Sequence, residues 1–352
     1  MKLKQLLDGI SYEVQQGNAE LEISDIQYDS RKVEKDSLFV CITGFQTDGH
    51  KYIPMAVEKG AAALLCEHEV ENVPENVTVI VTENNRKALA VVSANLYGHP
   101  SREMHAIGVT GTNGKTSTTY LMKSILDRVG GKVGIVGTIE NRIGDKILKA
   151  ERTTPESKKL QALFRQMKEE DVTDVVMEVS SHALSLGKLA PITFEAAIFT
   201  NLTPEHLDFH ESMEAYAEAK ARLFAASERS IVCTDSPYAQ RMLCAAGGNA
   251  LTCSSEGGRA DYTATLLRQS LREGVHYRLD SARASLRMLC PIPGRFSMVN
   301  SMLASVTAMD LGLRPAGVKA AVASIPGVKG RMERVPLGVG AGFTVLIDYA
   351  HT

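Results

Sequence analysis

The sequence lacks three features, and each absence excludes a class of function. Its formal net charge is only −2 over 352 residues and it has no long basic block, so nothing indicates a nucleic-acid-binding surface. Its apolar runs are short, such as residues 61–66, and fall far below the roughly 18 residues of a membrane span. Asp8 interrupts the first apolar stretch before it reaches signal-peptide length, so we expect neither a membrane partner nor export.

The cysteines form no recognisable pattern. Six are scattered along the chain, and none belongs to a C-x-x-C pair. Disulfide frameworks and zinc sites typically have regularly spaced cysteines. Because this chain lacks such spacing, we expect reduced, buried thiols in a cytoplasmic protein. With 44% hydrophobic and 23% charged residues, the composition is that of an ordinary globular protein. The length is enough for about two domains.

Residues 1–98 are predicted to form a small α/β domain. The turn formers Gly98, Pro100 and Ser101 follow one another closely and mark its boundary. Within it, the apolar pattern predicts strands around 37–41, 62–66 and 77–81 and helices around 54–59 and 86–97.

Residues 99–335 are predicted to form a central domain in which strands alternate with helices. Such alternation implies a mostly parallel sheet with helices on its faces. Residues 261–290 alternate in polarity and predict an antiparallel subsheet, and residues 336–352 are expected to begin a further domain. The expected central-domain elements are strands at 105–110, 133–138, 174–179 and 195–200, helices at 296–311 and 315–324, and a buried-type strand at 343–350.

The segment GVTGTNGKTSTT, residues 108–119, indicates a phosphate-binding loop in a P-loop ATPase-like domain. Its spacing departs from G-x-x-x-x-G-K-[ST], because Val109 stands where the first glycine belongs. The loop nevertheless lies between a predicted strand and a predicted helix, where backbone N–H groups and the helix N-terminus favour phosphate. Lys115 would contact the β- and γ-phosphates and Thr116 would bind Mg²⁺. The alternative is a glycine-rich turn with an incidental lysine.

Three further candidates follow predicted strands, where α/β proteins bind ligands. Glu178 could bind a metal or be an ordinary surface carboxylate. In His206-x-Asp208-x-His210 we favour a Mg²⁺ ligand at His206 over zinc, because no third ligand is close in sequence; Asp208 or His210 could instead cap the next helix. Lys220 has Tyr216 and Phe224 at i−4 and i+4, so it is either a solvated lysine or an amine activated by burial.

In order and separation, GTNGKTS, EVSSH, TNLTPEHLDFH and EAKARLF resemble the motifs of the Mur ligases of peptidoglycan synthesis. Loops of the GTNGKT type occur throughout that family, which accounts for the unusual spacing. The resemblance covers essentially all 352 residues but only the first two of the family's three domains. The chain is most similar to the branch that adds the third residue of the stem peptide, through DSRKVEKDSLFV (29–40), GFQTDGHKYI (44–53), TTP (153–155), GRMERV (330–335) and DYAHT (348–352).

The resemblance implies a defined reaction. ATP phosphorylates the terminal carboxylate of UDP-N-acetylmuramoyl-L-alanyl-D-glutamate, and the amine of a diamino acid then displaces phosphate. Phosphorylation supplies the leaving group that a carboxylate lacks, and Lys115 with Mg²⁺ would stabilise the transferred charge. The diamino acid would be meso-diaminopimelate or L-lysine, and the similarity of ALSLGK to Gram-positive-type enzymes favours the former.

By resemblance, residues take the following roles. Two Mg²⁺ sites would involve Thr116, Glu178 and His206, with Lys220 as a carbamate that turns a cation into a metal-binding anion. ATP would contact Gly111, Thr112, Asn113, Gly114, Lys115, Thr116, Ser117, Asn300, Arg331, Asp348 and His351. The UDP-substrate would contact Tyr28, Ser30, Phe45, Gln46, Thr47, Thr153, Thr154, Ser180 and Lys188.

Two positions depart from the family pattern. Lys188 stands where arginine is typical, which keeps the charge but loses the bidentate fork; it could also be an exposed loop lysine. Arg152 stands where asparagine is often found.

Two other functions remain open. Without the third domain, the 352-residue chain would bind the UDP-substrate and perhaps ATP but form little amide. Folylpolyglutamate synthetases share the ATP loop but lack the uridine-binding domain.

Overall fold

The computed structural model describes residues 1–44, 47–337 and 343–350, and the chain divides into two compact units. The first unit comprises Met1–Glu103, Pro155–Gln166 and Ser185–Ile192. The second comprises Met104–Thr154, Met167–Leu184 and Thr193–Thr352. The domain boundaries expected at residues 98 and 335 remain a prediction, since units defined by contacts are not the domains of a family.

The first unit is built on a five-stranded sheet in the order β1-β5-β4-β3-β2. Strands β2 to β5 are parallel and β1 pairs antiparallel with β5, so the predicted strands are confirmed with small changes at their ends. The elements are α1 (Leu3–Leu6), β1 (Glu13–Gln16), β2 (Asp25–Gln27), β3 (Ser37–Val40), α2 (Ile53–Glu58), β4 (Ala61–Cys66), β5 (Thr78–Val81) and α3 (Asn85–Tyr97), with 3-10 turns Ser30–Lys32, Gly49–Tyr52 and Pro100–Glu103.

Both faces of this sheet are covered, and the side chains of each strand alternate between two hydrophobic clusters. Leu38 and Val40 belong to one cluster with residues of α1 and α3, whereas Phe39 and Cys41 belong to another with residues of α2. Strands buried on both faces have the continuous apolar sequence that made these segments predictable.

Asn85 ties the carboxyl ends of these strands together. Its side chain is fully buried and donates to the carbonyl oxygens of Cys41 and Leu65 at 2.6 and 2.9 Å. Its own oxygen accepts a hydrogen bond from the Thr82 hydroxyl at 2.7 Å. The first residue of α3 therefore satisfies polar groups at the carboxyl ends of three different strands.

The second unit is built on an eleven-stranded sheet in the order β16-β15-β14-β13-β12-β11-β6-β10-β7-β8-β9. Its centre from β14 to β7 is parallel, and the predicted antiparallel segment forms one edge as β14, β15 and β16. A second antiparallel edge, β8 and β9, was not predicted. The strands are β6 (His105–Thr110), β7 (Val133–Val136), β8 (Glu140–Ile143), β9 (Lys146–Lys149), β10 (Asp174–Glu178), β11 (Phe194–Phe199), β12 (Ser227–Cys233), β13 (Ala250–Ser254), β14 (Tyr262–Ser270), β15 (Gly274–Ser281) and β16 (Ser285–Cys290).

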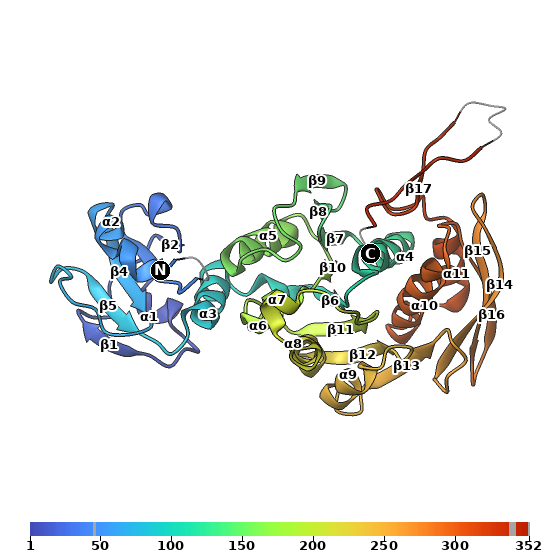
Figure 1. Ribbon diagram of the computed structural model, residues 1–352. Helices are drawn as coiled ribbons and strands as arrows, with labels where there is room; N and C mark the ends of the chain where they lie inside the picture. Colours follow the sequence, from blue (N-terminus) through green and yellow to red (C-terminus); the bar gives the residue numbers. More distant parts are fainter. Residues whose placement is uncertain (45–46, 338–342, 351–352) are drawn as a thin grey trace. The chain divides into compact units, whose positions relative to one another are not determined.

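Two groups of helices pack on this sheet (Figure 1). Helices α4 (Lys115–Arg128), α10 (Arg295–Asp310) and α11 (Pro315–Ala323) contact one another, and α4 and α10 also contact the central strands. Helices α8 (Met213–Ala225) and α9 (Ala239–Ala245) form the second group, on β11 and β12. The other helices are α5 (Ser157–Glu169), α6 (Ser181–Ser185) and α7 (Leu207–His210). None of the helices in the described residues is long and apolar enough to cross a membrane.

Two expectations need correction. The buried-type strand expected at 343–350 is only β18 (Leu346–Ile347), and its residues are exposed or half-buried. It pairs with β17 (Glu333–Arg334) in a separate two-stranded ribbon, so no larger sheet buries its apolar side chains. All six cysteines are free as expected, but Cys244 is exposed and only the other five are buried.

We predict that Asn85→Ala lowers the free energy of unfolding by about 2 to 3 kcal/mol, because buried carbonyl oxygens lose their donor. Urea denaturation followed by circular dichroism measures the change. The matched control is Asn76→Ala at an exposed position, which should stay within about 0.5 kcal/mol of the unsubstituted chain. Equal effects of the two substitutions would contradict this role of Asn85.

Candidate functional site

The loop between β6 and α4 has a backbone that only glycine fits at two positions. Gly111 has φ +149° and Gly114 has φ +87°. A Cβ at Gly111 would lie 1.9 Å from the Thr200 hydroxyl, and one at Gly114 would lie 2.5 Å from Asn300 Oδ1. The loop ends at the N-terminus of a fourteen-residue helix, whose first N–H groups have no intrahelical acceptor. This arrangement suits an anion.

The segment after β11 holds this loop in place. The backbone N–H of Asn113 donates to Asn201 Oδ1 at 2.9 Å, and the Thr200 hydroxyl donates to the Asn113 carbonyl at 2.6 Å. Thr112 donates its N–H to the Asn201 carbonyl at 3.0 Å, and its hydroxyl accepts the N–H of Thr203 at 3.0 Å. The motif TNLTPEHLDFH includes Thr200 and Asn201, but nothing in its pattern predicted these contacts with the loop.

Two lysines converge on one backbone oxygen of the loop. Lys115 Nζ donates to the carbonyls of Gly111 and Thr112 at 2.9 and 2.8 Å. Lys220 Nζ, from α8, donates to the same Gly111 carbonyl at 2.9 Å. Burial lowers the pKa of Lys115. The carboxylates of Glu178 and Glu205 raise this pKa, and the Arg331 charge lowers it. Burial, and then the Lys115 charge, lower the pKa of Lys220 well below its ordinary value.

The surroundings of Lys220 exclude the solvated alternative. The residue is 1% exposed, as are Tyr216 and Phe224, so the helix face predicted to be shared with these aromatics is buried. Lys220 Nζ lies 4.6 Å from the centre of the Tyr216 ring. A buried amine with a lowered pKa is available in its neutral, nucleophilic form.

Glu178 is a buried acceptor and not a surface carboxylate. It is 1% exposed at the carboxyl end of β10, and its Oε2 accepts the Thr116 hydroxyl at 3.0 Å. Thr138 donates both its N–H and its hydroxyl to this carboxylate, at 2.8 and 3.0 Å. No motif in the sequence pointed to Thr138, which lies just after β7.

The predicted threonines lie in the same hydrogen-bonded group. Thr154 is buried; its hydroxyl donates to the Glu178 carbonyl at 2.9 Å and accepts the N–H of Ser180 at 3.1 Å. The Thr153 and Thr138 hydroxyls lie 3.0 Å apart. The carboxyl ends of β6, β7 and β10 thus bring residues from four segments together.

A third histidine joins His206 and His210. The His182 ring lies 5.0 Å from the His206 ring and 5.6 Å from the His210 ring, centre to centre. His210 Nε2 is 2.8 Å from the Ser181 hydroxyl, and burial lowers the pKa of His210 to about 4. The suggestion that Asp208 or His210 caps the next helix is wrong, because the Ser212 hydroxyl accepts the Ala215 N–H and caps α8.

His206 itself is partly exposed, with φ +56°. Its ring centre lies 6.3 Å from that of Tyr216, the residue that covers Lys220.

The remaining ATP candidates of the second unit differ in placement. Asn300 is buried on α10, with its side-chain oxygen beside Gly114. Arg331 has a buried Nε that finds no hydrogen-bond partner among the residues that the structure describes. Asp348 accepts the Met332 N–H at 2.7 Å, and Ser117 is buried in the first turn of α4. His351 lies outside the described residues.

The UDP-substrate candidates of the first unit are partly described. Ser30 is buried, Tyr28 is half-buried, and the exposed Thr47 has its hydroxyl 3.3 Å from that of Tyr52. Phe45 and Gln46 lie outside the described residues.

Lys188 is not an exposed loop lysine. It is 6% exposed, and its Nζ lies 2.6 Å from Glu156 Oε1 in an ion pair within the first unit. A buried charge requires such a partner.

Two family models match the chain. The model described as Mur ligase middle domain matches residues 109–308, and the model described as Mur ligase family, catalytic domain, matches residues 22–97. Together they include the loop, both lysines, Glu178 and the three histidines.

Curated relatives match over the full length of the chain. The UDP-N-acetylmuramoyl-L-alanyl-D-glutamate--2,6-diaminopimelate ligase 1 of Clostridium acetobutylicum is 42% identical over 352 residues, 100% of this chain and 72% of the relative. The 2,6-diaminopimelate ligase of Clostridium tetani is 41% identical over 354 residues, 100% of this chain and 73% of the relative. A solved 2,6-diaminopimelate ligase structure has a TM-score of 0.83 at 27% identity, covering 96% of this chain and 69% of that one.

We predict that Gly111→Ala destabilises the chain more than Gly130→Ala does, in thermal and urea denaturation followed by circular dichroism. Both glycines have positive φ, so both substitutions cost about 1 to 2 kcal/mol of backbone strain. A Cβ at Gly130 meets nothing within 4 Å, whereas one at Gly111 collides with Thr200 and the Asn201 backbone. The collision should add about 1 to 3 kcal/mol. Equal losses would mean that the loop does not pack as described.

Proposed function

The chain belongs to the Mur ligase family, and we propose that it joins meso-diaminopimelate to UDP-N-acetylmuramoyl-L-alanyl-D-glutamate at the cost of ATP. The observation that carries the proposal is the convergence of Lys115 and Lys220 on the Gly111 carbonyl, beside a helix N-terminus and a buried carboxylate. Such a site can bind a triphosphate, bind a metal and stabilise charge transferred between oxygens.

The loop is proposed to hold the phosphates of ATP. The Lys115 ammonium would exchange its bonds to the Gly111 and Thr112 carbonyls for phosphate oxygens, and a bound anion would restore its pKa. The Arg331 charge acts on Lys115, and its buried Nε has no acceptor among the described residues, which supports an anion near both side chains. Asn300, Ser117 and Asp348 are proposed as further contacts.

Thr116, Glu178 and His206 are proposed ligands for Mg²⁺. The first two already lie 3.0 Å apart, and both offer the oxygen atoms that this ion prefers. When bound, Mg²⁺ would neutralise charge on the phosphates. His206 is connected to this group by contacts: its ring packs near the Tyr216 ring, and the Tyr216 ring in turn lies beside Lys220 Nζ.

Lys220 is proposed to react with CO₂. The neutral amine attacks the carbon of CO₂, one proton leaves to solvent, and the product is an anionic carbamate. Burial and the Lys115 charge favour the neutral amine that this step requires. The carbamate would be attracted to Lys115 and could contribute an oxygen to the metal site.

The reaction then follows from these positions. The glutamate carboxylate of the substrate attacks the γ-phosphorus of ATP and ADP leaves. The amine of the diamino acid attacks the acyl carbon, loses a proton, and phosphate departs. Thr153, Thr154, Ser180 and Lys188 are proposed to contact the muramoyl-peptide, and Tyr28, Ser30, Phe45, Gln46 and Thr47 the uridine portion.

The alternatives have less support. The names of the curated relatives favour diaminopimelate over L-lysine. The match of residues 22–97 to a Mur ligase model disfavours folylpolyglutamate synthesis, which needs no uridine-binding domain. The proposed compartment is the cytoplasm.

The function is tested by mixing the chain with ATP, Mg²⁺, the UDP-substrate and meso-diaminopimelate, and measuring phosphate and the amide product by mass spectrometry. We expect phosphate release to require both acceptor and donor, and to be slower with L-lysine. In parallel, isothermal calorimetry measures the binding of ATP and of the UDP-substrate to the chain. Binding of both with little amide would support the binding module that is the alternative for these 352 residues, whereas failure of the chain to bind the UDP-substrate would contradict the ligase proposal.

We predict that Lys115→Ala weakens ATP binding by about 10- to 100-fold, because a charged hydrogen bond is worth about 1.5 to 3 kcal/mol. Isothermal calorimetry measures the affinity. Lys319→Ala removes an exposed lysine and is the control for a change in net charge. If both variants bind ATP as tightly as the unsubstituted chain, the loop does not hold the phosphates.

We predict one carbamate signal in the ¹³C spectrum of the chain incubated with ¹³C-bicarbonate. It should disappear in Lys220→Arg, whose guanidinium stays protonated. The signal should weaken as the pH falls, because protonation removes the attacking amine. Lys123→Arg, at another buried lysine, should retain it. Persistence of the signal in Lys220→Arg would place the carbamate elsewhere.

A further inference from the structure

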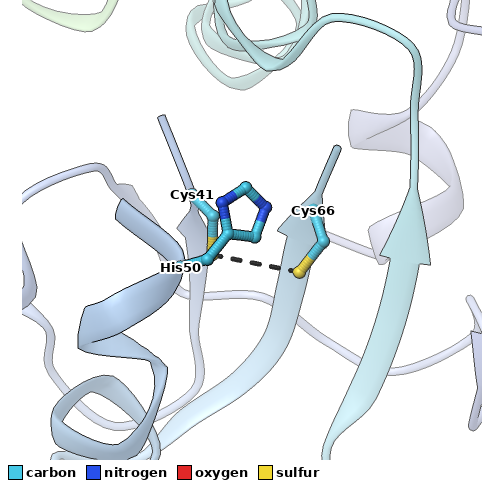
Figure 2. A group of neighbouring side chains, drawn as sticks. All are labelled: Cys41, His50 and Cys66. Atoms are coloured by element: carbon cyan, nitrogen blue, oxygen red, sulfur yellow. Dashed lines mark hydrogen bonds between the residues drawn. The ribbon is translucent and has the colours of Figure 1, made fainter. Parts of the chain in front are cut away.

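A cluster of two cysteines and one histidine lies in the first unit, and none of the three side chains has a role in the proposed function (Figure 2). Cys41 directly follows β3, Cys66 ends β4, and His50 belongs to the 3-10 turn Gly49–Tyr52. One sulfur or nitrogen atom from each residue lies within 4.8 Å of the other two. Both cysteines are fully buried, and the His50 side chain is only 7% exposed.

The two thiols are placed by the pairing of the parallel strands. Val40 is the register partner of Leu65, so the next residues, Cys41 and Cys66, face each other across the two strands. Their sulfur atoms lie 3.9 Å apart in a hydrogen bond, drawn as the dashed line in Figure 2. Zn–S bonds of about 2.3 Å at a tetrahedral angle separate two sulfurs by about 3.8 Å. The pair therefore already has the spacing of two zinc ligands.

His50 has the carboxylate partner that is typical of a metal-binding imidazole. Its Nδ1 lies 2.6 Å from Asp48 Oδ1, which fixes the proton on Nδ1 and leaves a lone pair on Nε2. That lone pair accepts the backbone N–H of Glu67 at 3.0 Å. A metal would take the place of this N–H. The exposed His68 ring, 4.2 Å from His50 between centres, covers the other side of the imidazole.

We propose that Cys41, His50 and Cys66 bind one Zn²⁺ ion, with water as the fourth ligand. Thiolate and neutral imidazole are the ligands that zinc prefers, and two thiolates balance its charge in a buried site. On binding, each thiol loses a proton to the buffer and the sulfur–sulfur hydrogen bond is replaced by two Zn–S bonds. The ion would connect the ends of β3 and β4 to the turn that precedes α2.

The experiment is zinc titration of the full chain, kept reduced with a phosphine, in competition with a chromogenic chelator. We expect one Zn²⁺ per chain, release of two protons in calorimetry with buffers of different ionisation heat, and visible bands of tetrahedral thiolate coordination with Co²⁺. Cys41→Ser and Cys66→Ser should each abolish this binding. Cys244→Ser, at the exposed cysteine, is the matched control and should retain it.

A buried cysteine variant can unfold, so a second variant keeps all three ligands. Asp48→Asn removes the negative charge beside His50 Nδ1 but keeps a side-chain oxygen that can accept the His50 backbone N–H, so it should weaken zinc binding by about 10- to 100-fold with an unchanged circular dichroism spectrum. The proposal is overturned if the reduced chain binds no zinc, if folded Cys66→Ser binds it as well as the unsubstituted chain, or if Asp48→Asn leaves the affinity unchanged. Mass spectrometry that finds a Cys41–Cys66 disulfide persisting after treatment with the phosphine would overturn it too.

Discussion

The carbonyl oxygen of Gly111 is the point on which the site depends. It accepts hydrogen bonds from two lysine Nζ atoms, each at 2.9 Å, that come from helices α4 and α8 of the second unit. The two amines can lie this close because they share one acceptor and because burial and the Lys115 charge favour the neutral form of Lys220. The carbonyl can point inward because Gly111 has a φ that side chains rarely allow. Anything that turns this peptide separates the two lysines.

The parallel sheet explains why such distant residues meet. The strands β6, β7 and β10 end at one edge, and the loop, Thr138 and Glu178 follow these ends directly. The carboxyl edge of a parallel sheet collects side chains that are separated in sequence by a helix and a strand. Helix α8, which packs on β11 and β12, contributes Lys220. The Tyr216 ring lies against the Lys220 amine, and both residues are buried from water.

The features that could be predicted from the sequence are those that depend on a short local pattern of residues. Continuous apolar runs identified most parallel strands, and glycine and lysine between strand and helix identified the loop. The sequence did not identify Thr138, Thr200 or Asn201, because threonine and asparagine after a strand are common and their partners are set by packing. Nor did it identify the Cys41, His50 and Cys66 cluster, whose members come from two strands and a turn. The prediction of a buried strand at 343–350 was wrong for a related reason: an apolar run forms a buried strand only where another layer covers it.

The contact between Asn300 and Gly114 has a consequence for sequence variation. Asn300 lies on α10, which packs against α4 and the antiparallel edge of the sheet, so its side chain cannot easily move away from the loop. A larger residue at position 114 would have to be accompanied by a smaller one at position 300, although the two positions are 186 residues apart in the sequence (300 − 114 = 186). Positions 114 and 300 should therefore covary among descendants of this chain. Grafting the loop alone into another scaffold would lose the contact with Asn300 that helps to define the loop's shape.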